Sequence, residues 1–549
     1  MEDDQKVSNV SNEKQESNER ICKSSIFSLT RSCKGETITP VQGTIKGEIP
    51  TWIKGNLLRN GSGLMEIGPD KFNHIFDGMA LLHRYHISNG EVTYQNKFLR
   101  SQTYNRNMNA NRIVVSEFGT KAHPDPCKTL LQRLMSMFVL DDFTDNDLVN
   151  VVPYGDEIYA HTETPFIHRI DPNTLETLDR VNIGQQVAVN TATAHPHFEH
   201  DGTVYNLGSS LASSRPLYNI IKFPSTTKSG KLKFDEGTVI CSIPALSKRN
   251  PSYFHSFAMT ENYFVFVEQP LTINLMKFGF SSFTGSTFMD CMNWTSNYQN
   301  RFHVIKRSTG EVFPTVYVAE PFFTFHHINA YEENEHIIVD ACCYQDASVI
   351  KALLVVEMEK GEKDRKSYGE KILSQARRYV IPLKISNDEQ NPKTNIIQLE
   401  SSQAEANVQD NGDVFLKYEE LTEEGPLLCE LPRINYDEFN GKKYKYFYAL
   451  GKLSENLQTY LIKVNVQNRT KTIWLEEKTI PSEPVFVGRP GATEEDDGVI
   501  LSAVLSEDNQ NKVFLLVLDA NTFQELGRAE FLLDSAVTGD FHGIFWPAT

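Results

Sequence analysis

The stretches FIHRIDPNTLETLDR (166–180) and FLLVLDANTFQELGR (514–528) match position for position at an offset of 348 residues. In each, a β-rich run ends in Asp, Asn-Thr follows, and a second run begins. Asp, Asn and Thr favour turns because their side chains hydrogen-bond to nearby backbone N–H groups. Each stretch therefore predicts a strand–turn–strand hairpin. HVIKRSTGEVFPTVYV (303–318) and LIKVNVQNRTKTIWL (461–475) are looser copies of it.

Short β-rich runs fill the chain from about residue 40 onward, and helical periodicity is confined to 127–138 and a charged stretch at 357–371. Hairpins scattered along a long all-β chain are typical of the blades of a β-propeller. Ordinary hairpins of another β fold would give the same pattern. We expect an all-β fold of the propeller type. The further predicted strands are EVTYQNKFL (91–99), NYFVFVEQPLTINLM (262–276), HIIVDACCY (336–344), GDVFLKYEEL (412–421), KYKYFYAL (443–450) and GVILSAVL (498–505).

The composition limits the class of protein. The 549 residues are 40% hydrophobic and 11% aromatic, enough for a large core. A chain of this length would usually form three or four domains, but large β barrels and propellers form single domains that are longer than usual. The formal net charge of −17 argues against a nucleic-acid partner, because phosphate binding needs a concentrated positive field.

The cysteines and the N-terminal residues indicate the compartment. The eight cysteines form no CxxC pair, so neither a zinc ribbon nor a disulfide scaffold is indicated. Residues 1–25 have the composition of a disordered polar tail without the apolar core of a signal peptide. No run approaches the roughly 18 apolar residues of a membrane span. We expect a cytoplasmic protein with a single catalytic domain over residues 26–549.

Four histidines stand in distinctive local settings. They are His195 in AHPH, His255 in SYFHSF, His326 in FHHIN and His542 in DFHGIF. Their spacing is too long for one loop or helix, so only a closed, ring-like fold would bring them together. Four neutral imidazoles would suit a redox-active divalent iron better than a hydrolytic zinc.

Other interpretations of these histidines remain open. Most lone histidines are structural, and HPHFEH (195–200) is compact enough for a local metal site of the cupin kind. Pro196 argues against a regular central strand at that point. In FHH (325–327) the adjacent imidazoles would point to opposite faces of a strand, so at most one would reach a shared centre.

Several long blocks resemble the signatures of the animal carotenoid cleavage oxygenases, and the resemblance runs from about residue 40 to the C-terminus. The family includes the vertebrate carotene dioxygenases, the retinoid isomerohydrolase of the retinal pigment epithelium and the insect NinaB isomerooxygenases. The chain looks most like the carotenoid-cleaving members, NinaB in particular. The blocks are NLLRNGSG (56–63), FDGMALLHRY (76–85), AHPH with EHDGTVYNLG, PSYFHSFAMTENYFVFVEQP, FHHINAYEENEHIIVDACCY, PSEPVFVGRPGATEEDDGVILS and FHGIF.

The resemblance implies a seven-bladed propeller, capped by a few helices and loops, that holds Fe(II) on its axis through the four histidines. It also implies that Glu163 in HTETPF, Glu430 in CELPRINY and Glu483 in PSEPVFV accept hydrogen bonds from three of the imidazoles. A carboxylate on the distal N–H fixes the tautomer and makes the ligand more basic.

A carotenoid has few polar groups, so the resemblance also implies an apolar, aromatic tunnel. Candidate lining residues beside the ligands are Thr162, Phe325 and Tyr344, and ordinary core packing would explain each of them equally well.

The segment PDPCKTLLQRLMSMFVL (124–140) is amphipathic and resembles the membrane-binding segment of the animal members. Leu131, Leu134 and Phe138 lie on its apolar face, and Cys127 matches a cysteine that can be S-acylated in the isomerohydrolase. A helix packed on the protein's own core would give the same pattern. We expect peripheral association with a membrane surface and no obligate protein partner.

The resemblance predicts an Fe(II)-dependent enzyme that uses O₂ to cleave a carotenoid such as β-carotene or zeaxanthin at its central 15,15′ double bond, giving retinal. In a NinaB-like enzyme this would be coupled to trans-to-11-cis isomerisation. The alternatives are a retinyl-ester isomerohydrolase, an eccentric-cleaving dioxygenase, and a non-catalytic carotenoid- or retinoid-binding propeller.

Overall fold

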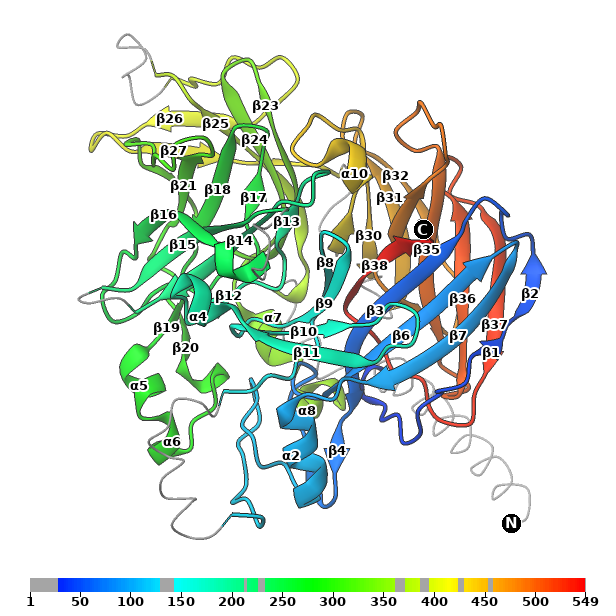
Figure 1. The fold of residues 1–549 in the computed structure, drawn as a ribbon. Helices are drawn as coiled ribbons and strands as arrows, with labels where there is room; N and C mark the ends of the chain where they lie inside the picture. The colour runs from blue at the N-terminus through cyan, green and yellow to red at the C-terminus, as the bar shows by residue number, and fades with distance from the viewer. Residues whose placement is uncertain are drawn as a thin grey trace, which may run out of the picture.

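A computed structural model describes residues 28–128, 143–211, 215–225, 233–360, 371–385, 394–422, 429–452 and 458–548. In these residues most of the regular structure is β (Figure 1), as the hairpin pattern predicts. The strands form seven sheets of four to six strands and two two-stranded ribbons.

Both ends of the chain contribute to closing the fold. The C-terminal strand β38 pairs with β3 of the first sheet, and the early strand β2 pairs with β37 of the last. The first sheet has the order β1 (Val41–Gln42), β7 (Glu91–Phe98), β6 (Met79–Ser88), β3 (Gly55–Leu64) and β38 (His542–Pro547). The last has β2 (Thr44–Gly47), β37 (Glu525–Leu532), β36 (Lys512–Asp519), β35 (Gly498–Ser506) and β33 (Thr479–Pro481), with β34 (Val485–Gly488) also on β35.

Five sheets lie between these two in the sequence. The second sheet is β11 (Thr177–Asn182), β10 (Phe166–Ile170), β9 (Glu157–His161) and β8 (Asn150–Tyr154). The third is β12 (Thr191–Ala192), β14 (Val204–Ser210), β15 (Leu217–Phe223) and β16 (Thr238–Pro244), with β13 (His197–Phe198) on β14. The fourth is β17 (Ala258–Met259), β18 (Tyr263–Glu268), β21 (Asn300–Lys306), β22 (Tyr317–Ala319), β27 (Val414–Lys417) and β26 (Glu405–Val408).

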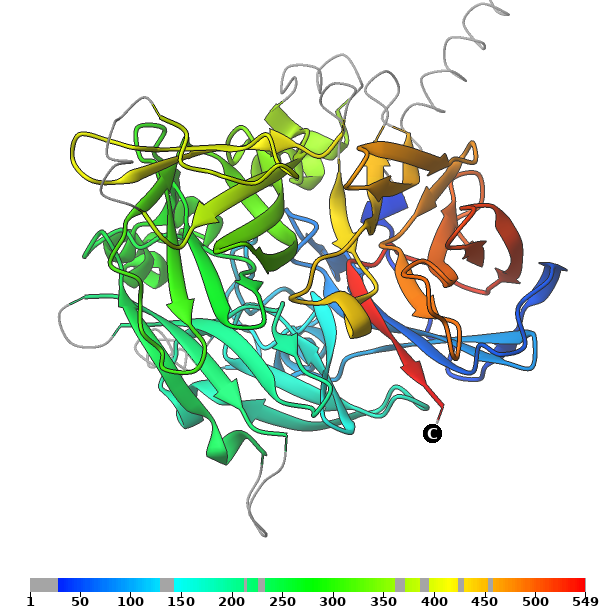
Figure 2. The ribbon, with the colours of Figure 1, turned by 90° about the horizontal axis from the view of Figure 1, so that it is seen from above.

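The fifth sheet is β23 (Phe323–Glu333), β24 (His336–Tyr344), β25 (Gln375–Pro382) and β28 (Glu419–Glu420). The sixth is β29 (Glu430–Arg433), β30 (Tyr446–Lys452), β31 (Thr459–Asn465) and β32 (Thr470–Trp474). The ribbons are β4 (Glu66–Ile67) with β5 (Asp70–Lys71), and β19 (Leu271–Ile273) with β20 (Met292–Trp294). Seen from above, the sheets follow one another around the molecule in chain order (Figure 2).

Short helices connect these sheets. The α-helices are α2 (Gln102–Ala110), α4 (Ile183–Val187), α5 (Leu275–Gly279), α6 (Ser281–Thr284), α7 (Ser348–Ala352), α8 (Val355–Met358) and α10 (Tyr436–Phe439). The 3₁₀ turns are η1 (Ser28–Thr30), η3 (Lys233–Glu236) and η4 (Met289–Cys291). Helices α2, α5, α6 and α8 lie at the bottom in Figure 1. No helix in the described part of the chain is both long and apolar enough to cross a membrane.

The two matching stretches are hairpins with the same turn chemistry. Strands β10 and β11 pair antiparallel, as do β36 and β37. Asp171 and Asp519, at equivalent positions, each accept a backbone N–H of the following turn at 2.7–2.8 Å. Leu175 and Phe523, also equivalent, have φ of 58° and 59°. The hairpin prediction is confirmed down to single residues.

Both faces of the inner strand β35 are buried. On β35, Val499 and Leu501 pack towards the first sheet, whereas Ile500 and Val504 pack with residues of β30 and β31 in the sixth. Successive side chains alternate between faces, so a strand between two neighbouring sheets is apolar throughout. This explains the nearly continuous apolar run GVILSAVL (498–505) in the sequence.

The two predicted helices lie mostly outside the described residues, and one predicted strand is divided. The run 262–276 is two strands followed by the start of α5, and α8 ends at Met358, inside the charged stretch at 357–371. Residues 361–370 lie outside the described residues, as do the tail over 1–25 and residues 129–142 of the amphipathic segment.

Candidate metal centre

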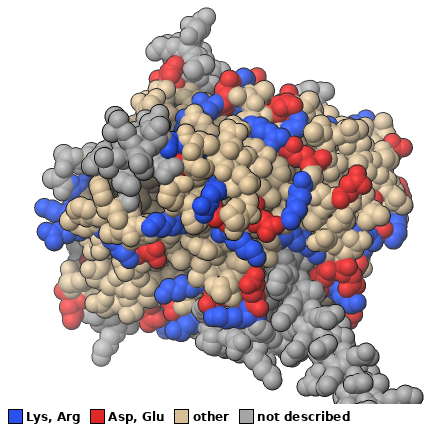
Figure 3. All heavy atoms as spheres, turned by 90° about the horizontal axis from the view of Figure 1, so that it is seen from below, with Lys and Arg blue, Asp and Glu red and all other residues tan. Residues whose placement is uncertain are grey.

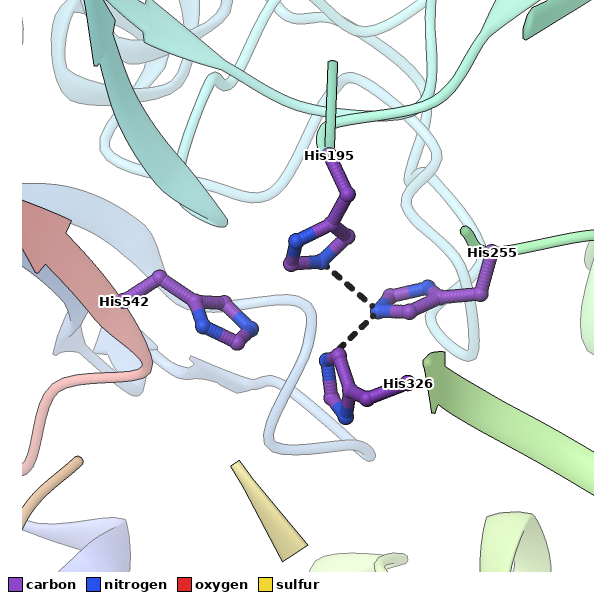
Figure 4. Close-up of side chains that lie close together, drawn as sticks. All are labelled: His195, His255, His326 and His542. Carbon is purple, nitrogen blue, oxygen red and sulfur yellow. Dashed lines mark hydrogen bonds between the residues drawn. The ribbon is translucent and has the colours of Figure 1, made fainter. Parts of the chain in front are cut away.

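Four histidines from separate parts of the fold converge on one point (Figure 4). The Nε2 atoms of His195 and His255 are 3.0 Å apart, and those of His255 and His326 are 3.2 Å apart. One ring nitrogen from each of the four, including His542, lies within 4.8 Å of the others. The structure therefore brings together the four histidines that the sequence singled out.

Local backbone features direct these side chains inward. His326 lies on β23 where the register with β24 shifts on both sides of His327, and such bulges re-aim side chains. The adjacent His327 turns instead to Ser256, whose Oγ lies 2.8 Å from its Nδ1. His542 begins β38 opposite Asn60 of β3.

His195 lies in the connection between β12 and β13, where Thr193 Oγ1 accepts its backbone N–H at 2.7 Å. His197 does not join the cluster, because its ring faces the Phe257 carbonyl and the Tyr436 hydroxyl, each at 3.0 Å. The alternative of a local, cupin-like site within HPHFEH is therefore wrong. The pair His195 and His197 is split as the intervening proline suggests.

Three glutamates hold the distal nitrogens of three of the imidazoles. His255 Nδ1 donates to Glu163 at 2.5 Å, and His326 Nδ1 donates to Glu430 at 2.6 Å. The third pair is His542 with Glu483, at 2.8 Å. The structure places each predicted glutamate beside a predicted histidine. Among the described residues, His195 has no such carboxylate.

The donor set fits a metal ion. The Nδ1–H groups of His255 and His326 point to carboxylates, so the Nε2 lone pairs of these two rings face each other at 3.2 Å. A cation between them removes this repulsion. A metal–imidazole bond of about 2.0–2.1 Å places two adjacent ligand nitrogens about 3 Å apart, which matches the spacing seen.

The histidines are held in the form that binds metals. Burial lowers the pKa of His195 well below its usual value, and the neighbouring imidazoles lower it further. Burial also lowers the pKa of His542 to about 4, although Glu483 opposes the shift. Imidazole binds metals in its neutral state, so no proton has to leave these rings at neutral pH.

A large cavity opens onto the histidine cluster. Its volume is about 1480 Å³, and its lining includes three of the histidines (His255, His326 and His542) and the three predicted tunnel residues (Thr162, Phe325 and Tyr344). Phe325 lies against His255, with ring centroids 5.0 Å apart. These positions are those expected of tunnel residues, and their role stays a prediction.

The cavity continues along a series of aromatic rings that sequence reasoning missed. From Phe325 the contacts run through Phe76, Phe118 and Phe288 to Phe278, with successive centroids 5.6–6.3 Å apart. All five rings line the cavity. Phe76 stands in one of the quoted blocks, but no spacing in the sequence marks these residues as neighbours.

The outer part of the cavity lies near exposed apolar side chains. Met276 on α5 and Phe283 on α6 are 60% and 59% exposed, and Phe283 also lines the cavity. Figure 3 views the side on which these helices lie, where charged side chains of both signs are interspersed with uncharged surface. Cys127 is exposed, and Leu131, Leu134 and Phe138 lie outside the described residues.

Fold and site together define a protein of the β-propeller type with four converging histidines whose arrangement fits a metal ion. A family model described as RPE65, retinal pigment epithelial membrane protein, matches residues 30–547. The chain belongs to this family, the carotenoid oxygenases, and the family resemblance seen in the sequence is confirmed.

Proteins similar to this chain are named as carotenoid-cleaving enzymes. The chain is 44% identical over 517 residues to the mitochondrial carotenoid-cleaving dioxygenase of Mustela putorius furo, with 93% of this chain and 94% of that protein covered. It is 41% identical over 521 residues to the beta,beta-carotene 15,15′-dioxygenase of Mus musculus, covering 94% and 90%. A cobalt-substituted apocarotenoid oxygenase of Synechocystis superposes with a TM-score of 0.73 at 22% identity, covering 95% and 99%, which shows the shared propeller fold.

Proposed function

We propose that this protein is a carotenoid cleavage dioxygenase that uses O₂ to cut the central 15,15′ double bond and release retinal. The observation that carries the proposal is the histidine cluster with its three glutamates, opening directly into an aromatic cavity of about 1480 Å³. The names of the relatives at 41–44% identity support the same reaction.

The proposed ligands are His195, His255, His326 and His542, and the proposed ion is Fe(II). Four neutral nitrogens suit several transition metals, and the use of O₂ selects a redox-active one. Bound there, iron supplies the activation of O₂ that organic side chains lack. One O₂ and one C=C bond give two aldehydes, so each carbon of the broken bond receives one oxygen atom.

The protein's own residues position the reaction. Glu163, Glu430 and Glu483 hold the Nδ1 protons of His255, His326 and His542 and so keep these three imidazoles directed at the centre. The aromatic wall formed by Phe325 and its neighbours orients an apolar polyene and excludes water. Thr162 and Tyr344 complete the wall beside the ligands.

The architecture is part of the proposal. We assign the seven larger sheets as the seven blades of one propeller domain over residues 26–549, preceded by the tail over 1–25. The chain ends close the ring through β38 with β3 and β2 with β37, and closure removes exposed sheet edges.

We also propose peripheral association with membranes through the segment 124–140 and the apolar residues of α5 and α6. The exposed Met276 and Phe283 beside the cavity support this, because a carotenoid would pass from lipid to the site without crossing water. Acylation of Cys127, which is exposed, would add a second anchor.

A second candidate reaction is cleavage at another double bond of the polyene. The name of the relative at 44% identity specifies no bond, whereas that of the relative at 41% specifies 15,15′. We also propose that cleavage is coupled to trans-to-11-cis isomerisation, so that part of the retinal released is the 11-cis isomer.

The test is product analysis with matched metal controls. Fe(II)-loaded protein is incubated in air with β-carotene, and in parallel with zeaxanthin, and the products are separated against retinoid standards. Retinal alone supports central cleavage, and an 11-cis isomer adds isomerisation. Longer apocarotenals would select the second candidate. Intact carotenoid with turnover of retinyl ester would overturn the proposal in favour of the isomerohydrolase, and inertness towards both would leave a binding protein.

A further inference from the structure

Glu483 differs from the other two glutamates of the centre because arginines contact it. Arg59 donates from Nη1 to Glu483 Oε2 at 2.7 Å. Arg433 Nε lies 3.8 Å from Glu483 Oε1, and its Nη2 donates to the Gly543 carbonyl at 2.7 Å. The Gly543 N–H donates to Glu483 as well, at 3.2 Å. This carboxylate therefore has two guanidiniums beside it as well as the histidine.

Among the described residues, no arginine or lysine forms an ion pair with Glu163 or Glu430. Glu163 accepts the Tyr253 hydroxyl at 2.7 Å in addition to His255. Glu430 accepts the Leu431 backbone N–H at 2.9 Å in addition to His326. Within the described part of the chain, the ion-pair partners of these two carboxylates are histidines only.

The hydrogen bonds to the histidines follow this difference. They measure 2.5 Å at Glu163 and 2.6 Å at Glu430, but 2.8 Å at Glu483, whose negative charge is shared with the arginines. Burial alone would raise the pKa of Glu483, yet the charges of Arg433, His542 and Arg59 hold it well below its usual range.

Arg59 also binds a fourth carboxylate. Its Nε donates to Asp540 Oδ1 at 2.9 Å, and both side chains are almost completely buried, at 0% and 5% exposure. Among the described residues, four carboxylates and two guanidiniums therefore belong to the hydrogen-bond and ion-pair network around the histidine cluster, which leaves two negative charges in excess. Imidazoles that bind a metal are neutral, so the four histidines add no charge to this sum.

We propose that Arg59 and Arg433 are positioning residues that set the charge around the centre to match a divalent ion and to disfavour a trivalent one. The inference rests on the proposed metal centre. Charges in a buried site are poorly screened, so an ion whose charge the surroundings neutralise is favoured over an ion that leaves one charge uncompensated. Loss of either arginine leaves three negative charges in excess and favours the trivalent ion.

The experiment measures the Fe(III)/Fe(II) midpoint potential of the iron-loaded protein. Arg433→Gln removes one cation and changes a partly exposed side chain. Arg59→Met combined with Asp540→Asn removes the buried ion pair as a unit and leaves the net charge unchanged. Arg59→Lys and Arg433→Lys keep the charge. The matched control is Arg378→Met with Asp340→Asn, a buried pair of the same type with two hydrogen bonds of 2.8 Å in the fifth sheet.

We expect Arg433→Gln to raise the ratio of Fe(III) to Fe(II) affinity at least tenfold, which lowers a one-electron midpoint potential by about 59 mV. The lysine variants and the Arg378/Asp340 control keep the wild-type potential. The absorption spectrum of the Co(II)-loaded variant should stay like that of the wild type, which shows that the four imidazoles still bind. The Arg59/Asp540 variant removes one charge of each sign and leaves two negative charges in excess, so we expect it to keep the wild-type potential.

A wild-type potential in Arg433→Gln with an unchanged Co(II) spectrum would overturn the inference, even if the Arg59/Asp540 variant failed to fold. An equal shift in Arg433→Lys would also overturn it, because geometry rather than charge would then be responsible. A wild-type protein that binds neither iron nor cobalt would instead refute the proposed metal centre itself.

Discussion

The Glu163 carboxylate lies 2.5 Å from Nδ1 of His255, across 92 residues of the chain. The same oxygen accepts the Tyr253 hydroxyl, so the carboxylate is fixed from two sides. We expect Glu163→Gln to weaken iron binding by about 10–100-fold, because an amide holds the Nδ1 proton less strongly than a carboxylate. Metal titration of the purified variant measures this. Glu268→Gln, which changes the buried partner of His303 away from the centre, is the control and should bind iron normally.

Removal of a ligand has a larger effect. His255→Ala leaves a gap between His195 and His326, so we expect loss of both bound iron and turnover. Elemental analysis of the protein after Fe(II) loading and desalting checks the first, and carotenoid consumption checks the second. His303→Ala, which removes a buried histidine outside the cluster, should keep its iron. An active, iron-replete His255→Ala protein would show that the ligand assignment is wrong.

Two roles of Phe325, packing in the core and lining the cavity, can be distinguished by comparison with Phe302. The ring lies 5.0 Å from His255 and faces the cavity, whereas Phe302 is buried in a core cluster between sheets. We expect Phe302→Ala to lower the free energy of unfolding by about 3–5 kcal/mol. Phe325→Ala should lower it less, because Phe325 packs in a smaller cluster and also lines the cavity.

Turnover should show the opposite order. Phe325→Ala should reduce kcat/KM for β-carotene more than Phe302→Ala does when both are assayed well below their unfolding temperatures. Chemical denaturation and steady-state kinetics on the same preparations give both quantities. A stability loss at Phe325 equal to that at Phe302, with kcat/KM unchanged, would assign Phe325 to the core alone.

Much of the site could be predicted from the sequence because its residues stand in long recognisable blocks, and the hairpins could be predicted because Asp171 and Asp519 have local turn chemistry. The contacts of Arg59 could not. Its partner Glu483 is 424 residues away, and the two meet where the first sheet packs against the last. The bulge that separates His326 from His327 and the aromatic path through Phe118 depend in the same way on long-range packing.

Membrane binding by the amphipathic segment 124–140 can be tested at the three apolar residues that the sequence predicts on one face. Replacing Leu131, Leu134 and Phe138 with Ser should weaken binding to liposomes more than it slows turnover of detergent-solubilised substrate. Co-sedimentation with vesicles and product analysis in detergent measure the two effects. Serine at three exposed apolar residues elsewhere, Leu246, Ile473 and Leu532, is the control and should leave both unchanged. Equal losses in the two assays would mean that the segment packs on the protein's own core.

His161 predicts a pH dependence of stability. It is 1% exposed and stacks on Tyr154, and burial lowers its pKa to about 3. The unfolded chain takes up a proton near pH 6.5 and the folded protein does not, so this residue destabilises the fold as the pH falls from 6.5 towards 3. Between pH 7 and pH 5 the loss is about 2 kcal/mol.

We expect His161→Phe to escape that loss because phenylalanine does not titrate and keeps the stacking contact. Urea unfolding at pH 7 and pH 5 gives the difference in unfolding free energy between the wild type and the variant, which should shift by about 2 kcal/mol in favour of the variant at the lower pH. Tyr159→Phe changes a neighbouring ring without removing a group that titrates in this window, so it should keep the wild-type slope. Parallel slopes for His161→Phe and the wild type would mean that His161 takes up its proton in the folded protein as readily as in the unfolded chain.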